Sequence, residues 1–329
     1  MSDVVLEAKE LTCHFGGGWS LSGRKPPIRA VEGVSLAVRR GRTLGVVGES
    51  GCGKSTVARM LVGLLEPTAG SLVLDGRPVG PLRGQARRDY HRRVQLVFQD
   101  PLGSLNPRRT VAQILEAPLV GLGRDDRETR RRKVERMVEQ VGLRPEHLHR
   151  YPHEFSGGQA QRIVIGRALI LEPEVLVLDE PVSALDVSIQ AQILSLLREL
   201  QQRLGLTYVF ISHDLAVVEG LCDEVAVMYL GRVVEQASRE ALFRAPRHPY
   251  TRTLLSAVPG QRGHRLPLQG EPPSPAAPPP GCAWAPRCYR AEARCSREAP
   301  ALAADSESHL TACHFAHDSE PDATLTAPA

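Results

Sequence analysis

The sequence contains few aromatic residues, carries little excess charge and has no long apolar run. Phe, Trp and Tyr make up 4% of the 329 residues, which argues against the base-stacking surfaces of proteins that bind single-stranded nucleic acid. A formal net charge of +4 permits an anionic ligand or a membrane surface without demanding nucleic acid. No apolar stretch approaches the roughly 20 residues that span a bilayer. We therefore expect a globular chain without a membrane span of its own.

Signal-peptide features are also missing from the first residues, which show no basic segment followed by an apolar one. We therefore expect the chain to stay in the cytoplasm, where disulfides are rare. Three of its seven cysteines are scattered along the sequence. The other four crowd together near its end: Cys282, Cys288, Cys295 and Cys313. This uneven distribution requires a separate explanation.

The sequence is organised around a glycine-rich loop over residues 48–56, with the spacing Gly-x4-Gly-Lys-Ser. Residues 43–47 form an apolar, β-branched run that predicts a buried parallel strand. Apolar residues at helical spacing over 57–65 predict a helix after the loop. Strand, glycine loop and helix in this order indicate a P-loop, which binds phosphate. A chance glycine turn is the alternative, and the complete spacing argues against it.

The residue types in this loop suit a nucleoside triphosphate. Glycines allow backbone N–H groups to approach phosphate oxygens, and the following helix adds its positive N-terminus. Lys54 is expected along the β- and γ-phosphates, and the Ser55 hydroxyl is expected on Mg²⁺. The predicted nucleotide cradle consists of Gly48, Ser50, Gly51, Cys52, Gly53, Lys54, Ser55 and Thr56. Earlier in the chain, Phe15 is a candidate to stack on adenine, or equally a core aromatic.

Two acids and a histidine follow two further buried strands. The apolar run over 175–178 ends in Asp179 and Glu180. An Asp at the carboxyl end of a parallel strand beside a P-loop is where Mg²⁺ is held, and Glu180 is then placed to polarise water. His213 follows a predicted strand over 207–211 and is expected to reach phosphate. Taken singly, the acids could cap a strand and the histidine could be structural.

Residues 100–172 have a helical pattern, which we interpret as a helical insertion in an α/β core. Segments 110–119 and 126–141 are predicted helices within it, and the basic run of the second is interpreted as a solvated face. Ser156 is a predicted N-cap. Together with the glycines that follow, it forms a candidate anion-binding turn, which is a weak signal by itself.

The remaining segments complete the predicted organisation. Alternating residues over 4–12 and 30–38 predict an antiparallel edge sheet, residues 225–236 a hairpin, and residues 239–255 two short helices. We expect a nucleotide-binding domain over 1–258, a proline-rich connector over 259–281, a cysteine-rich module over 282–317 and a tail over 318–329.

With these motifs in order, the chain resembles the ATP-binding subunit of an ABC transporter. Residues 48–56 are similar to the Walker A loop of that family, and residues 175–180 to Walker B with its catalytic glutamate. Further matches are Gln99 to the Q-loop, residues 155–159 to the signature motif with Phe where Leu is commoner, residues 183–186 to the D-loop, and His213 to the switch histidine. The resemblance implies an α/β P-loop NTPase core, the ABC ATPase domain over 1–258, with an antiparallel β subdomain, a helical subdomain over about 100–172 and a small Cys-rich C-terminal extension.

The resemblance also implies a head-to-tail dimer with two ATP molecules between the subunits. Lys54, Ser55, Gln99, Asp179 and His213 of one subunit would face Ser156, Gly158 and Gln159 of the other. Glu180, His213 and Gln99 would be the catalytic residues, and Ser55, Gln99 and Asp179 would hold Mg²⁺. Ala160 departs from the Arg that usually follows the signature glutamine, which puts a contact beside the γ-phosphate in doubt.

Three shorter stretches narrow the resemblance to importers of dipeptides and oligopeptides: residues 98–108, 247–251 and 279–282. Residues 179–186 favour the second, F-type ATPase of dipeptide permeases. The implied partners are a second ABC ATPase subunit (in a heterodimer or a homodimer), two transmembrane permease subunits and an extracytoplasmic solute-binding protein, without nucleic acid. The chain would then lie peripherally on the cytoplasmic face of the cell membrane. A soluble ABC ATPase acting on nucleic acid or ribosomes, and a regulatory ATP-binding module, are the alternatives.

The four clustered cysteines lie in a segment with too few large apolar residues for a core, so the segment needs a staple. Disulfides are disfavoured in a reducing compartment, and the cysteine spacings are wider than the tight pairs of structural zinc sites. Uneven intervals suit a [4Fe–4S] cluster, and some peptide-importer ATPases with this spacing carry one. We predict such a cluster on Cys282, Cys288, Cys295 and Cys313, with Zn²⁺ and then unliganded thiols as alternatives.

Overall fold

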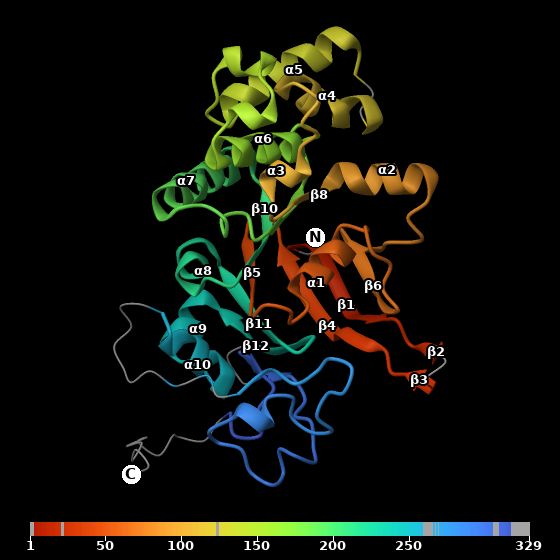
Figure 1. Ribbon diagram of the computed structural model, residues 1–329, viewed down its shortest axis with the longest axis vertical. Coiled ribbons are helices and arrows are strands. Elements are labelled where there is room, and N and C mark those ends of the chain that lie inside the picture. Colours follow the sequence, from red (N-terminus) through yellow and green to blue (C-terminus); the bar gives the residue numbers. More distant parts are fainter. Residues whose placement is uncertain are drawn as a thin grey trace.

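The computed structural model describes residues 3–20, 23–122, 125–258, 266, 268, 270–304 and 309–316. A central α/β core lies between a helical end and a C-terminal extension at the opposite end (Figure 1). Across these described ranges, no helix is long and apolar enough to cross a membrane.

An eight-stranded sheet forms the core, in the order β13-β14-β12-β11-β5-β10-β9-β8. Its strands from β11 to β8 are parallel, whereas β12, β14 and β13 are added antiparallel. The bounds are β5 Thr43–Val47, β8 Val94–Val97, β9 Val175–Asp179, β10 Thr207–Ser212, β11 Glu224–Tyr229, β12 Arg232–Ser238, β13 Ala303–Ala304 and β14 Leu310–Thr311. The buried apolar runs of the sequence form the parallel strands, as predicted.

Both faces of the parallel strands are covered, and successive residues point into two hydrophobic clusters. Leu176 and Leu178 of β9 join the cluster that also contains α6 Gly157–Leu169, α7 Val187–Leu204 and α8 Leu215–Leu221. Val175 and Val177 of the same strand join the cluster on the other face, which contains α1 Lys54–Leu61. Helices α6, α7 and α8 therefore cover one face of the parallel strands, and α1 lies on the other.

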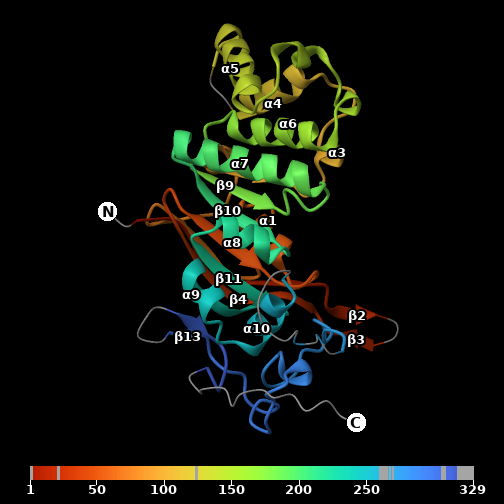
Figure 2. The same cartoon turned by 90° about the vertical axis from the view of Figure 1, so that its left-hand side faces the viewer.

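A four-stranded antiparallel sheet, in the order β4-β1-β6-β7, packs into the second cluster. Its strands are β1 Val4–Phe15, β4 Ile28–Arg39, β6 Ala69–Leu74 and β7 Arg77–Pro78, and a hairpin of β2 Gly18–Ser20 and β3 Gly23–Lys25 extends from it. Figure 2 shows this hairpin projecting away from the core. The antiparallel edge sheet predicted from residues 4–12 and 30–38 is confirmed, and both strands are longer than predicted.

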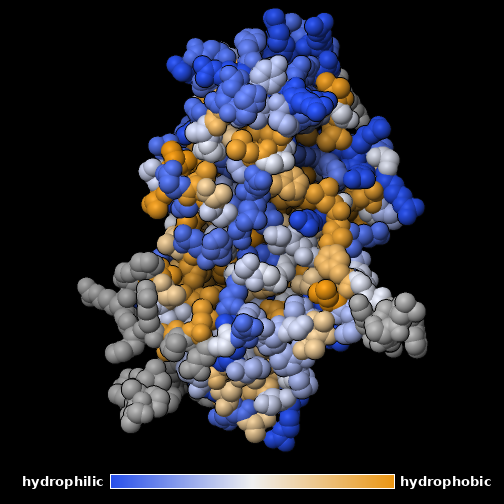
Figure 3. Space-filling model, viewed as in Figure 1, coloured by the Kyte–Doolittle hydropathy of each residue, from blue (hydrophilic) through white to orange (hydrophobic). Residues whose placement is uncertain are grey.

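The helical end consists of α3 Pro101–Ser104, α4 Val111–Leu122, α5 Arg127–Gln140 and α6, with 3₁₀ turns at Pro145–His149 and Pro152–Glu154. It confirms the predicted helical insertion, and Asp126 caps α5 by accepting a hydrogen bond from the Thr129 N–H. Figure 3 shows that its surface is largely hydrophilic. Another helix, α2 Gly84–Arg93, was not predicted, because it buries only Tyr90 and lacks an apolar stripe.

The C-terminal extension packs on the core instead of forming a core of its own. Its strand β14 pairs with β12, next to the helices α9 Arg239–Arg244 and α10 Pro249–Ser256. Trp284 is 1% exposed, and its ring centroid lies 5.0 Å from that of Tyr229 and 4.8 Å from that of Tyr250. The extension thus shares the core's aromatic residues and packs without a core of its own. Its predicted boundaries stay predictions.

Candidate nucleotide-binding site

The P-loop lies between β5 and α1, and two of its glycines meet strict backbone requirements. Gly48 has a φ of +153°, and a Cβ there would lie 2.2 Å from the carbonyl oxygen of Met228. Gly53 precedes α1 with a φ of +105°, and a Cβ there would lie 2.3 Å from the carbonyl oxygen of Ala30. Neither position has room for a side chain, so glycine lets the loop lie close against the core.

Lys54 is held inside this loop. It is buried, and its Nζ donates hydrogen bonds to the carbonyl oxygens of Gly48 at 2.8 Å and Glu49 at 2.9 Å. These bonds keep the ammonium group at the N-terminus of α1, where the helix dipole is also positive. The arrangement suits the phosphates of a nucleotide.

Ser55 and Asp179 come together from α1 and the end of β9. The Ser55 hydroxyl donates a hydrogen bond to Asp179 Oδ1 at 3.0 Å. Burial raises the pKa of Asp179, and the hydrogen bond from Ser55 opposes this effect. A hydroxyl and a carboxylate side by side are the oxygen ligands that Mg²⁺ prefers, so these residues fit that ion.

Glu180 is the centre of a second cluster, directly after Asp179. Its carboxylate Oε2 accepts a hydrogen bond from Gln99 Nε2 at 2.9 Å and lies 3.3 Å from His213 Nδ1. The Glu180 backbone has a φ of +48° and donates its N–H to the carbonyl oxygen of Ile211. Strained backbone of this kind concentrates at functional sites. The structure therefore brings the three predicted catalytic residues together on one carboxylate oxygen.

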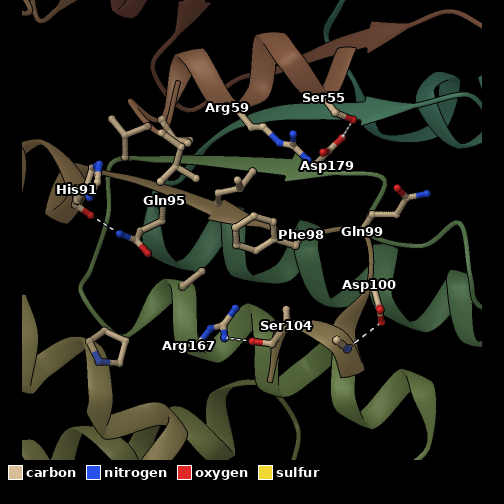
Figure 4. A pocket seen from close by; sticks show the side chains of 17 residues that line it. Ser55, Arg59, His91, Gln95, Phe98, Gln99, Asp100, Ser104, Arg167 and Asp179 are labelled. Carbon is tan, nitrogen blue, oxygen red and sulfur yellow. Dashed lines mark hydrogen bonds between the residues drawn. The ribbon is translucent and has the colours of Figure 1, made fainter. Parts of the chain in front are cut away.

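A cavity of about 740 Å³ opens beside these residues, between the core and the helical end. Figure 4 shows Ser55, Arg59 and Asp179 on its core side and Ser104 and Arg167 on its helical side, with Phe98 and Gln99 between them. Phe98 is 38% exposed. Gln99 thus links the Glu180 carboxylate with the junction between core and helical end.

Ser156 begins α6, as predicted, in the helical end. Its hydroxyl accepts a hydrogen bond from the Gln159 N–H, while the Gln159 side chain accepts one from the Ser156 N–H. A Cβ at Gly158 would lie 2.4 Å from Ile189 Cγ2 of α7, so this glycine also permits close helix packing. Ala160 is fully buried in the hydrophobic cluster that contains α6 and α7.

The other predicted cradle residues differ in exposure. Ser50 and Gly51 are exposed, Cys52 is buried and Thr56 is half-buried. Phe15 is 40% exposed at the end of β1, so the alternative that it is a core aromatic is wrong. Stacking of Phe15 on adenine stays a prediction.

Two contacts of the P-loop were not predicted from the sequence. Arg287 of the C-terminal extension forms an ion pair with Glu49 in the loop, 238 positions earlier. Tyr250 of α10 also reaches the loop, through a hydrogen bond from the Glu49 N–H. No local sequence pattern predicts such distant contacts.

The four C-terminal cysteines line one small cavity of about 10 Å³, next to Trp284 and Phe315. Burial raises the pKa of the Cys288 thiol to about 11. Within the part of the chain that the structure describes, no group of three or more His, Cys, Asp or Glu residues is placed to hold a metal ion. The structure therefore gathers the four predicted ligands around one cavity, but among the described residues they are not placed to hold a single metal ion such as Zn²⁺. The iron–sulfur cluster stays a prediction.

Comparisons with known proteins agree with this geometry. The sequence model of the family described as "ABC transporter" matches residues 31–183, and that of the "Oligopeptide/dipeptide transporter, C-terminal region" matches residues 234–295. The dipeptide transport ATP-binding protein DppF of Escherichia coli is 50% identical over 97% of this chain and 96% of its own. The di/tripeptide transport ATP-binding protein DppF of Pseudomonas aeruginosa is 50% identical over 95% of this chain and 98% of its own.

Solved structures show the same fold. The ABC transporter subunit cbiO1 of Clostridium perfringens has a TM-score of 0.64 at 29% identity, over 74% of this chain and 92% of its own. The ATP-binding cassette MJ0796, solved as a dimer bound to ADP and Pi, has a TM-score of 0.63 at 27% identity, over 71% and 98% of the two chains. The P-loop, the Ser55–Asp179 pair and the Glu180 cluster thus lie in a known ATPase fold. This chain belongs to the ATP-hydrolysing, ATP-binding subunits of ABC transporters, in the branch with the oligopeptide/dipeptide C-terminal region.

Proposed function

We propose that this chain couples ATP hydrolysis to the uptake of dipeptides or oligopeptides through separate permease subunits. Its relatives at 50% identity are named as transport proteins for dipeptides and tripeptides, along nearly the full length of both chains. The structural observation that best supports ATP hydrolysis is the position of the Glu180 carboxylate. It lies beside the Ser55–Asp179 pair and is contacted by Gln99 and His213. The chain would work peripherally on the cytoplasmic face of the membrane.

In the proposed mechanism, Lys54 and the loop N–H groups bind the β- and γ-phosphates. Ser55 and Asp179, with Gln99, would hold Mg²⁺, which neutralises phosphate charge when bound. Glu180 Oε2 accepts a proton from the water that attacks the γ-phosphorus. Gln99 and His213 position this carboxylate, since both contact the same oxygen. As the water oxygen bonds to the γ-phosphorus, the bond from that phosphorus to the β–γ bridging oxygen breaks and ADP leaves.

The proposed site is completed by a second ATPase subunit. Within one chain, Lys54 lies at the start of α1 in the core, whereas Ser156 lies at the start of α6 in the helical end. The exposed N-terminus of α6 would therefore contact the γ-phosphate on the other subunit's P-loop. The partner subunit is either a second copy or a related chain, and binding of two ATP molecules would close the pair.

The cavity between core and helical end is the proposed contact site for a permease. Its surroundings expose the apolar residues Leu64, Phe98 and Leu102, and Figure 3 shows apolar surface on this side of the molecule. Exposed apolar patches mark protein interfaces. Because Gln99 lies between this cavity and Glu180, permease motion there would reach the catalytic carboxylate.

Co-purification tests the importer assignment. Affinity-tagged full-length chain, extracted from membranes of its own cells in mild detergent, should retain two hydrophobic permease chains and a second ATPase. Replacing Phe98 by Asp should release the permeases and leave nucleotide binding intact. Recovery of ribosomes or DNA in place of membrane chains would overturn the importer assignment.

We also propose a [4Fe–4S] cluster on the four C-terminal cysteines, as a structural group. The supporting observation is that all four line one cavity. Each cysteine would bind a different iron atom, so the ligands need not be as close as those of a single metal ion. Protein purified without oxygen should contain about four irons and four labile sulfides per chain. Colourless anaerobic protein without iron would contradict the cluster.

A further inference from the structure

The P-loop is contacted from the C-terminal extension by a paired arginine. Arg287 Nη1 lies 2.8 Å from Glu49 Oε2, and Nη2 lies 3.1 Å from Glu49 Oε1. Each terminal guanidinium nitrogen thus donates a hydrogen bond to a different carboxylate oxygen. This is the bidentate geometry in which such ion pairs are strongest. Arg287 lies in the 3₁₀ turn Ala285–Arg287, directly before Cys288.

This ion pair is shielded from water. The Arg287 side chain is 5% exposed and that of Glu49 is 19% exposed. The guanidinium carbon lies 4.8 Å from the centroid of the Trp284 ring, and Nη1 is 3.4 Å from the Tyr229 hydroxyl. Aromatic residues of the core therefore hold the arginine in position, and screening by salt is weak at such a depth.

The Glu49 backbone is fixed independently of Arg287. Its N–H donates to the Tyr250 hydroxyl at 2.8 Å, and its carbonyl oxygen accepts from Lys54 Nζ at 2.9 Å. The arginine is therefore not needed to hold the loop's main chain. Its separate contribution is to the side chain, where it supplies the positive charge that balances the carboxylate.

A carboxylate in a phosphate-binding loop is electrostatically unfavourable. The loop binds the polyphosphate through Lys54 and backbone N–H groups, and a free negative charge next to them repels that ligand. The bidentate arginine cancels this charge and orients the carboxylate toward the extension. Without Arg287, Glu49 would be a half-buried, unbalanced charge in the loop.

We propose that Arg287 is a positioning residue for nucleotide binding: it neutralises Glu49 from the C-terminal extension, so ATP affinity depends on the docking of that extension. The inference rests on nucleotide binding at the P-loop and is independent of the transported cargo. Through Arg287, the extension contributes to the ATPase site in addition to packing Trp284 against the core.

A double-mutant cycle on the full chain tests this role, with binding of a non-hydrolysable ATP analogue measured by calorimetry. Arg287→Ala should weaken binding about tenfold, equal to about 1.4 kcal/mol. Glu49→Gln should bind at least as tightly as the wild type, since it removes the negative charge. The double variant Glu49→Gln/Arg287→Ala should recover affinity to within about threefold of the wild type. The affinity of Arg287→Lys should fall between those of the wild type and Arg287→Ala. Lysine keeps the positive charge but cannot form the bidentate pair of hydrogen bonds.

Arg294→Ala is the matched control. This arginine belongs to the same extension but pairs with Glu298 at the surface, so its loss should leave nucleotide affinity unchanged. Equal weakening in Arg287→Ala and in the double variant would overturn the proposal, because the arginine would then act only through the fold of the extension. Wild-type affinity in a folded Arg287→Ala protein would overturn it as well. If Arg287→Ala does not fold, the Arg287→Lys and Glu49→Gln variants carry the same test.

Discussion

At the residue scale, the proposed mechanism divides the site between groups that bind phosphate and groups that act on water. Lys54 is buried and donates hydrogen bonds to two carbonyl oxygens of the loop. Glu180 directly follows Asp179, which pairs with Ser55, and its carboxylate is contacted by Gln99 and His213. In that mechanism, the charge on Lys54 is needed for nucleotide binding and the charge on Glu180 for proton transfer. The two functions are therefore separable by mutation.

Glu180→Gln should retain ATP binding and lower kcat by at least about 100-fold, because an amide cannot accept the proton from water. Lys54→Ala should lose nucleotide binding itself. Phosphate release and analogue binding, measured on both variants, separate the two effects. Near wild-type hydrolysis by Glu180→Gln would show that another group is the base.

The sequence was sufficient to predict single residues where chemistry fixes both type and spacing. The P-loop, Asp179, Glu180 and His213 follow predicted strands at the same sheet edge, and the structure brings them together. The pair Arg287–Glu49 could not be predicted, since each residue alone resembles an ordinary surface charge. Only the docking of the extension, 238 positions away, makes them partners.

At the scale of elements, the start of α6 depends on its packing against α7. A Cβ at Gly158 would lie 2.4 Å from Ile189 Cγ2, which is too close for a methyl group. A Cβ at the preceding Gly157 would lie 3.2 Å from Leu185 Cδ2, the end of a longer side chain that can move away. The helix that carries Ser156 is thereby held at a fixed distance from α7. Its N-terminus stays exposed for a second subunit.

Gly158→Ala should lower the free energy of unfolding by about 1–3 kcal/mol through overpacking. Gly157→Ala is the control and should change it by less than about 1 kcal/mol, because alanine also favours the helix. Urea unfolding of the two variants gives the comparison. Equal stability of both variants would show that α6 and α7 adjust freely.

A buried polar cluster fastens α10 and β14 to β12. Glu235 is fully buried, accepts hydrogen bonds from the N–H groups of Arg247 and His248, and lies 2.6 Å from His309 Nε2. Burial lowers the pKa of His248 to about 4, with the Glu235 carboxylate opposing the shift. His248 also caps α10 through its Nδ1, which accepts from the Tyr250 N–H.

The lowered pKa of His248 predicts a loss of stability in acid. Since the folded pKa lies below the unfolded value of about 6.5, the unfolded chain takes up the proton first, and stability falls as the pH decreases from about 6.5 toward about 4. Between pH 7 and pH 5 this contributes about 2 kcal/mol. His248→Asn keeps a capping acceptor and should reduce the pH dependence of urea unfolding by about that amount. If the free energy of unfolding of His248→Asn depends on pH as steeply as that of the wild type, His248 is not the group responsible.

Elements were predictable where they bury an apolar face. The parallel strands, α5 and α7 all follow apolar runs or stripes in the sequence. Helix α2 was missed because its positions are mostly exposed and basic. The strands β13 and β14 were also missed, since two-residue strands depend on a partner that is distant in the sequence.

At the scale of the whole molecule, one chain carries the two halves of the proposed phosphate site in different parts of its fold. The P-loop belongs to the core, and Ser156 belongs to the helical end. Full ATPase activity should therefore require an assembled pair of subunits. In a dilution series of the purified chain, hydrolysis per molecule should fall as the concentration decreases, and Ser156→Arg should suppress it while leaving analogue binding intact. Constant activity per molecule across the series would argue for a site within one chain.

The proposed function is that ATP hydrolysis at Glu180 drives peptide uptake. The most direct test measures the uptake of a labelled dipeptide into cells that lack this chain. We predict that uptake is lost, that the wild-type chain restores it, and that Glu180→Gln at the same abundance does not. Uptake at the wild-type rate without the chain, or its restoration by Glu180→Gln, would contradict the account.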